Sequence, residues 1–153
     1  MRTSLLFPVA SIIVLGACRA ASQSPAATVS REQFKQLEWI AGTWRGSGGA
    51  YPAFFEEYRF VDDTTIRMRA FADSTLRTVT DSSVIAWRDG KIQSRDNVVV
   101  EFSPTSVRFK RPSATAGGHT FTRVSADEWT ATLHPAQSGG QATVYVMRRI
   151  GAP

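Results

Sequence analysis

The sequence changes from helical to strand periodicity at Gly42-Thr43-Trp44-Arg45-Gly46-Ser47-Gly48. Residues two apart point to the same face of a strand, so Gly42, Trp44, Gly46 and Gly48 share one face. One indole then stands beside three residues without side chains, which favours a bulky plug with open space or another backbone around it. We therefore predict a first strand over residues 43–48, with Trp44 as the plug.

Beyond this stretch the period stays at two, with β-branched and aromatic residues between turn residues. Asp89-Gly90 is typical of a two-residue hairpin turn, because both positions adopt positive φ angles. Further strands are predicted over residues 54–61, 65–71, 76–80, 84–88, 91–95, 98–102, 107–111, 119–124, 129–134 and 142–150. Short strands at this spacing indicate an antiparallel meander, and closure into a barrel removes its edges.

One short helix is predicted before the first strand. Ser30-Arg31-Glu32-Gln33 has the pattern of a capping box, in which Ser30 and Gln33 bond each other's backbone amides. Phe34, Leu37 and Ile40 then follow at helical spacing, and Gly42 ends the helix.

A helix followed by a G-x-W strand resembles the calycin superfamily of lipocalin-like barrels and, within it, bacterial domains of unknown function. The resemblance implies that Trp44 plugs the barrel bottom and that an arginine of the last strand, Arg148 or Arg149, packs on it; strand alternation leaves both open. The expected fold is all-β, a single antiparallel lipocalin-like or fatty-acid-binding-protein-like barrel of about ten strands behind one short helix.

A second resemblance, over residues 37–60, is to nitrobindin-like haem-binding barrels, which carry G-x-W-x-G-x-G followed by Tyr-Pro, here Tyr51-Pro52. Those proteins take an axial histidine from the start of the last strand, where this chain has Gln141, Ala142 and Thr143. No cofactor is therefore expected. Haem is a minor alternative with His119 and His134 as its candidate ligands, and otherwise both are interpreted as surface histidines at strand ends.

The amino terminus has the pattern of an export signal. Arg2 precedes an apolar run over residues 5–15, which is too short to span a bilayer and has the length of a signal h-region. Leu15-Gly16-Ala17-Cys18 resembles the lipobox of bacterial lipoproteins, which implies cleavage before Cys18 and a membrane anchor on its thiol. Cys18 is the only cysteine, so it cannot form an internal disulfide.

Three segments are thus predicted: a signal peptide over residues 1–17, a flexible linker over 18–29 rich in Ala, Ser and Pro, and one barrel domain over 30–150. Arg19 is not the aspartate that resembles an inner-membrane retention signal. We expect an exported, membrane-anchored protein of the cell envelope, at the outer membrane where the cell has one.

The formal net charge is +5, carried mostly by arginines that never form a dense run. A basic surface attracts nucleic acid or anionic lipid. Export makes nucleic acid a poor partner, so we interpret arginines such as Arg67 and Arg69 as solvated residues along strands.

No motif of established catalysis or metal binding is found. Glu56 and Glu57 are neighbours on a predicted strand and point to opposite faces, which prevents them from acting as a pair. Asp62-Asp63 falls in a predicted turn, and neither Asp127-Glu128 nor the histidines have metal-ligand spacing. We expect no enzyme and no metal site.

The sequence leaves two candidate functions for the barrel. The first is binding of a small apolar or amphipathic ligand inside the barrel, with Trp44, Tyr58, Phe60 and Met68 as candidate contacts; it requires a cavity of about 300 Å³. The second is a structural or interaction domain that contacts another envelope component through its basic outer face or a strand edge.

Overall fold

The computed structural model describes residues 25–114, 116–137 and 139–151. Within them it contains ten strands: β1 (Gly42–Gly48), β2 (Tyr51–Asp62), β3 (Thr65–Phe71), β4 (Val79–Arg88), β5 (Lys91–Ser94), β6 (Asn97–Ser103), β7 (Ser106–Lys110), β8 (His119–Arg123), β9 (Glu128–Leu133) and β10 (Thr143–Arg149). The predicted signal peptide, Cys18 and residues 18–24 of the predicted linker lie outside the described residues. No described helix is long and apolar enough to cross a bilayer.

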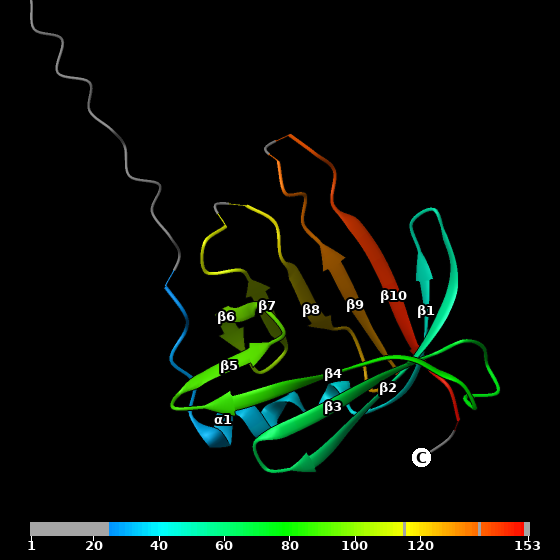
Figure 1. The fold of residues 1–153 in the computed structure, drawn as a ribbon, viewed down its shortest axis with the longest axis horizontal. Coiled ribbons are helices and arrows are strands. Elements are labelled where there is room, and N and C mark those ends of the chain that lie inside the picture. The colour runs from blue at the N-terminus through cyan, green and yellow to red at the C-terminus, as the bar shows by residue number, and fades with distance from the viewer. Residues whose placement is uncertain (1–24, 115, 138, 152–153) are drawn as a thin grey trace, which may run out of the picture.

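The strands form a closed antiparallel barrel (Figure 1). Each strand pairs with the next along the chain, and β10 returns to β1, where Trp44 lies opposite Arg149 and Gly46 lies opposite Met147. Asp89 and Gly90 turn the β4–β5 hairpin with φ angles of 49° and 76°. The predicted all-β barrel of about ten strands behind a short helix is confirmed.

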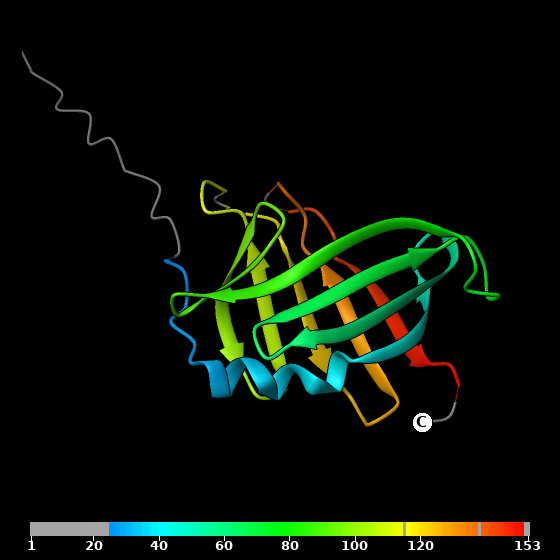
Figure 2. The same ribbon diagram turned by 60° about the horizontal axis from the view of Figure 1, so that its bottom comes forward.

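A short helical segment covers one end of the barrel, which we call the closed end (Figure 2). It comprises α1 (Arg31–Lys35) and the 3-10 helix η1 (Gln36–Ile40), and the predicted capping box between Ser30 and Gln33 is present. Phe34, Leu37 and Ile40 are fully buried beneath it. The helix closes this end because its apolar face caps the interior of the barrel.

Trp44 is buried at the closed end, as the plug interpretation requires. Its indole N–H donates to the Ile40 carbonyl at 2.8 Å, and the Arg149 guanidinium lies 4.3 Å from its ring centroid. Arg149 is therefore the arginine that packs on Trp44. Arg148 points outward and forms an ion pair with Glu128.

Several strand boundaries differ from the sequence analysis, and β4 differs in its continuity. Strands were predicted separately over residues 76–80 and 84–88, but residues 79–88 form one continuous strand, β4, and residues 76–78 precede it. The polar run Asp81-Ser82-Ser83 that indicated a break pairs residue by residue with Ala70, Arg69 and Met68 of β3. This run is polar because this part of β4 borders solvent and an interior hollow.

The predicted linker also ends earlier than residue 29. The backbone N–H of Ala27 donates to the Val99 carbonyl and that of Val29 to the Gly90 carbonyl, both at 2.8 Å. The Val29 side chain is buried, and its carbonyl accepts from the Trp87 indole at 2.7 Å. Residues 27–29 are therefore part of the packed barrel.

Candidate functional site

Two adjoining hollows lie inside the barrel, away from the helix. The larger, of about 260 Å³, is lined by Phe54, Glu56, Tyr58, His119, Phe121, Trp129, Ala131, Leu133, Tyr145 and Met147. The smaller, of about 140 Å³, is lined by Tyr58, Met68, Ser83, Ile85, Ser94, Arg95, Asn97, His119 and Phe121. Neither alone reaches 300 Å³. They share Tyr58, His119 and Phe121, so a molecule that spans both must contact these three side chains.

The hollows lie toward the end of the barrel opposite the helix, which we call the open end. Arg95 belongs to the β5–β6 turn, whereas the β4–β5 turn at the other end of β5 receives Val29 at the closed end. Figure 2 shows the β7–β8 and β9–β10 loops on the side of the barrel away from the helix. A ligand would therefore enter the barrel at this end, beside the β5–β6 turn and the β7–β8 and β9–β10 loops.

Glu56 is the acidic group of the larger hollow. It lies on β2 between Phe54 and Tyr58 and shares their inward face. Its carboxylate accepts a hydrogen bond of 2.8 Å from the Tyr58 hydroxyl. Burial raises the pKa of Glu56, the nearby Asp81 raises it further, and the bond from Tyr58 partly offsets both effects. Burial and Glu56 together raise the pKa of the Tyr58 hydroxyl well above its usual value.

His119 forms the wall between the two hollows. Its ring stacks on Phe109 with centroids 4.8 Å apart and lies 5.0 Å from Phe121. Burial, with a smaller contribution from His134, lowers the pKa of His119 to about 4. At neutral pH this side chain is an uncharged hydrogen-bonding group.

An ion pair stands at the margin of the smaller hollow. Arg95, from the β5–β6 turn, binds the carboxylate of Asp81 on β4. Ser83, Ser94 and Asn97 line the hollow beside it. Polar side chains therefore line the hollows at the open end, and aromatic side chains line them deeper in the barrel.

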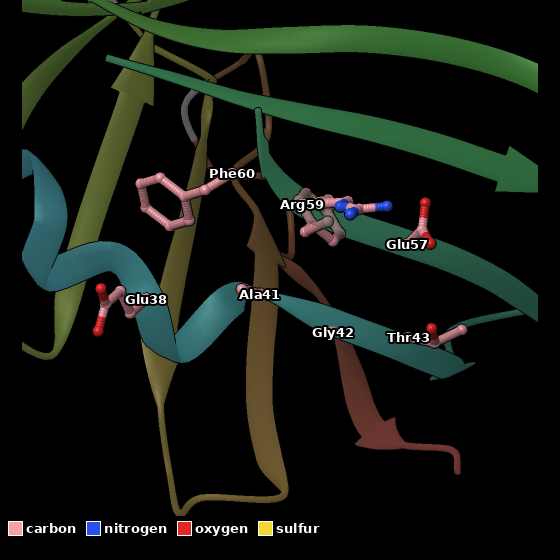
Figure 3. A pocket seen from close by; sticks show the side chains of 8 residues that line it. Glu38, Ala41, Gly42, Thr43, Glu57, Arg59 and Phe60 are labelled. Atoms are coloured by element: carbon pink, nitrogen blue, oxygen red, sulfur yellow. The ribbon is translucent and has the colours of Figure 1, made fainter. Parts of the chain in front are cut away.

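A third hollow, of about 580 Å³, lies outside the barrel and is broadly open to solvent. Figure 3 shows Glu57 and Arg59 on β2 near the backbone of Ala41, Gly42 and Thr43, while Phe60 lies over the helix. Glu57 accepts two bonds from Arg69, at 2.9 and 2.6 Å. Such an open surface encloses little of a small molecule, so we do not regard it as the site.

The four predicted ligand contacts separate into two pairs. Tyr58 and Met68 line the interior hollows. Trp44 belongs to the plug at the closed end, and Phe60 packs edge-to-face on Phe34 with ring centroids 5.7 Å apart. Trp44 and Phe60 hold the closed end together and line neither interior hollow.

The two candidate haem ligands, His119 and His134, line different hollows. His119 is an interior residue and not a surface histidine, but its ring is stacked and it borders hollows of only about 260 and 140 Å³. His134 bonds Thr120 at 2.7 Å and lines a separate hollow with Asn97 and Arg111. The two candidate ligands therefore do not face each other across one hollow.

The remaining candidate groups do not converge. Asp63 pairs with Arg31 and Lys35 of the helix, and Asp62 bonds Thr64 within the β2–β3 turn. Among the described residues no group of three or more His, Cys, Asp or Glu side chains could hold a metal ion.

Glu56, His119 and Tyr145 were not recognised as cavity residues from the sequence. Glu56 gave a usable signal: it is a charged residue at an inward position of a strand whose other inward residues are apolar or aromatic. His119 and Tyr145 gave none, because a residue near a strand end does not reveal which hollow it borders.

Comparisons with known proteins add little. No family model and no curated protein matches the chain. Two solved structures are similar in fold: a redesigned β-barrel, with 13% identity, coverage of 76% of this chain and 96% of that chain, and a TM-score of 0.40; and EF1p2_mFAP2b bound to DFHBI, with 12% identity, coverage of 75% and 97%, and a TM-score of 0.34.

Proposed function

We propose that this protein binds a small amphipathic molecule inside the barrel, in the two hollows at the open end. The observation that carries the proposal is the lining itself. Apolar and aromatic side chains form most of the wall, and a few polar groups, including Glu56, Ser83 and His119, converge on it. Ligand sites in proteins commonly have this composition, and small barrels that do not fill their interior hold one ligand.

We further propose that the barrel is anchored to a membrane of the cell envelope by a lipid on Cys18. The support is the apolar run and the Leu15-Gly16-Ala17-Cys18 motif. Fractionation with lipid labelling tests it. The native chain should take up labelled palmitate and enter the membrane fraction, and Cys18→Ser should do neither. Equal labelling and fractionation of the two chains would contradict the anchor.

The binding proposal is tested by filling the larger hollow. Ala131 points inward from β9 and Thr132 points outward beside it. Ala131→Phe places a ring in the hollow, whereas Thr132→Phe adds the same ring outside the barrel. With tryptophol, a neutral indole alcohol, calorimetry should detect binding to the native chain and to Thr132→Phe. Binding to Ala131→Phe should be at least about tenfold weaker, the loss of about 1.4 kcal/mol.

A second candidate function is contact with an anionic envelope component through the outer face. Arg59 lies opposite Arg67 across β2 and β3, and Arg45 lies opposite Arg148 across β1 and β10. Like charges held opposite each other favour an anionic partner. Reversal of Arg67 and Arg69 to Glu should remove partners recovered from intact membranes, and unchanged partners would count against this function.

A further inference from the structure

We infer that the ligand of the interior hollows carries a positively charged amine, which Glu56 holds among aromatic side chains. This inference rests on the proposed ligand-binding function and names the chemical class of the ligand.

The charges that line the hollows are unequal. Glu56 is the one carboxylate among the residues that line them, and Arg95 is the one cation. Arg95 is already bound to Asp81. The unbalanced charge among the residues that line the hollows is therefore negative, although the chain as a whole has a formal charge of +5.

The Glu56 carboxylate can accept a further hydrogen bond. Within the described part of the chain, its hydrogen-bond partner is the uncharged Tyr58 hydroxyl, and no ion pair reaches its carboxylate. A half-buried carboxylate without a cation is unfavourable, and its raised pKa reflects that cost. An ammonium group next to Glu56 would offset the cost with a charge-assisted hydrogen bond.

The walls around Glu56 suit an organic cation. Phe54 meets Tyr145 edge-to-face with centroids 5.4 Å apart, and Tyr58 meets Trp129 in the same way at 5.7 Å. Aromatic faces carry negative charge density that attracts ammonium groups. His119 also lines the hollows, and it is neutral at pH 7 because burial lowers its pKa to about 4, so it does not repel a cation.

Three probes of similar size test the inference. Tryptamine and tryptophol have the same indole and the same number of non-hydrogen atoms, and differ by an ammonium in place of a hydroxyl; indole-3-acetate carries a carboxylate instead. Calorimetry at pH 7 uses the full chain as its host produces it, in phosphatidylcholine nanodiscs when it is recovered from membranes. Tryptamine should bind about tenfold or more tighter than tryptophol, and indole-3-acetate weakest of the three.

Glu57 provides the matched control, because it is adjacent to Glu56 on β2 but points outward to Arg69. Glu56→Gln should bring tryptamine to within about threefold of tryptophol, and Glu57→Gln should keep the native preference for tryptamine. The ranking of the three probes on the native chain needs no variant, so the inference can be overturned even if Glu56→Gln does not fold.

The outcomes separate the inference from the function on which it rests. If tryptophol binds as tightly as tryptamine, if indole-3-acetate binds tightest, or if Glu56→Gln keeps the amine preference, the amine inference is overturned and interior binding stands. If none of the three probes binds the native chain, both are overturned.

Discussion

Arg149 stabilises the closed end through several contacts at once. Its guanidinium lies over Trp44 and donates to the Ala41 carbonyl at 3.1 Å, and its Nε lies 3.2 Å from Asp127. A cation–π contact contributes about 0.5 to 2 kcal/mol and a hydrogen bond about 1 kcal/mol. Arg148, the neighbouring arginine, makes an exposed ion pair with Glu128, and such pairs contribute little.

We therefore expect Arg149→Ala to lower the free energy of unfolding by about 2 kcal/mol or more, and Arg148→Ala by less than about 1 kcal/mol. Urea denaturation followed by tryptophan fluorescence measures both. Equal losses in the two variants would show that the contact with Trp44 contributes nothing specific.

His119 predicts a pH dependence of stability. Its folded pKa of about 4 lies below the ordinary value of 6.5, so the folded state disfavours the charged ring. The unfolded chain binds the proton more tightly, so the stability due to neutral His119 is full above about pH 6.5 and is lost as the pH falls toward 4.

An NMR titration of the imidazole resonances should show one histidine, His119, that remains neutral until about pH 4. His119→Phe keeps a ring against Phe109 and should reduce the fall in stability between pH 6.5 and 4. An apparent pKa of His119 near 6.5 would mean that its ring is not buried in the wall.

Glu56 predicts the opposite pH dependence. A folded pKa above the unfolded value means that the protonated form is favoured, so its contribution to stability is lost as the pH rises through the folded pKa. Glu56→Gln removes the charge, and we expect its Tm at pH 8 to exceed that of the native chain by a few degrees. The difference should disappear below about pH 4. Glu57→Gln, which breaks the pair with Arg69, should not raise Tm.

At the scale of the element, buried aromatic side chains of the short helix hold the closed end, among them Phe34 and Trp39. Phe34 is fully buried and meets Phe60 of β2 edge-to-face, while the next residue, Lys35, is exposed beside Asp63. Loss of a buried phenyl ring costs about 3 to 5 kcal/mol. Phe34→Ala should lose stability by about that amount, and Lys35→Ala by less than about 1 kcal/mol.

Thermal denaturation by circular dichroism distinguishes these two variants. A small loss in Phe34→Ala would mean that the helix contributes little to the closure of the barrel.

The sequence predicted the position of a helix or turn correctly where nearby residues determine it. The capping box fixed the start of the helix, and Asp89-Gly90 fixed the β4–β5 turn. The continuity of β4 through residues 81–83 was not predicted, since Asp81-Ser82-Ser83 has the composition of a turn. These residues adopt strand conformation because β3 supplies their hydrogen-bond partners. The local sequence of the segment does not predict that pairing.

At the scale of the whole molecule, the sequence predicted that the barrel closes, because a meander of strands must cover its edges. It did not predict where the interior hollows lie. Trp44 and Phe60 were expected to contact a ligand because they are aromatic and inward-facing. Which inward residue meets the helix and which meets a hollow depends on its height along the barrel, and strand alternation carries no information on height. Tyr58 lies between the two regions and lines both interior hollows, so its contact with a ligand stays a prediction.

The barrel therefore divides into a packed half and a hollow half. The packed half holds Trp44, Arg149 and the helix. The hollow half places Glu56, Tyr58 and His119 around space that packed side chains do not fill. A stable closed end leaves the open end free to hold a ligand without loss of the fold.

The most direct test of interior binding is the set of intermolecular NOEs between tryptophol and the methyl groups of the protein. Met68 and Ala131 line the hollows, whereas Val84 and Val144 are exposed side chains on strands of the barrel. We expect NOEs from the indole protons to the methyl groups of Met68 and Ala131, and none to those of Val84 and Val144. NOEs confined to Val84, Val144 or the Thr43 methyl group at the outer hollow would contradict a binding site inside the barrel.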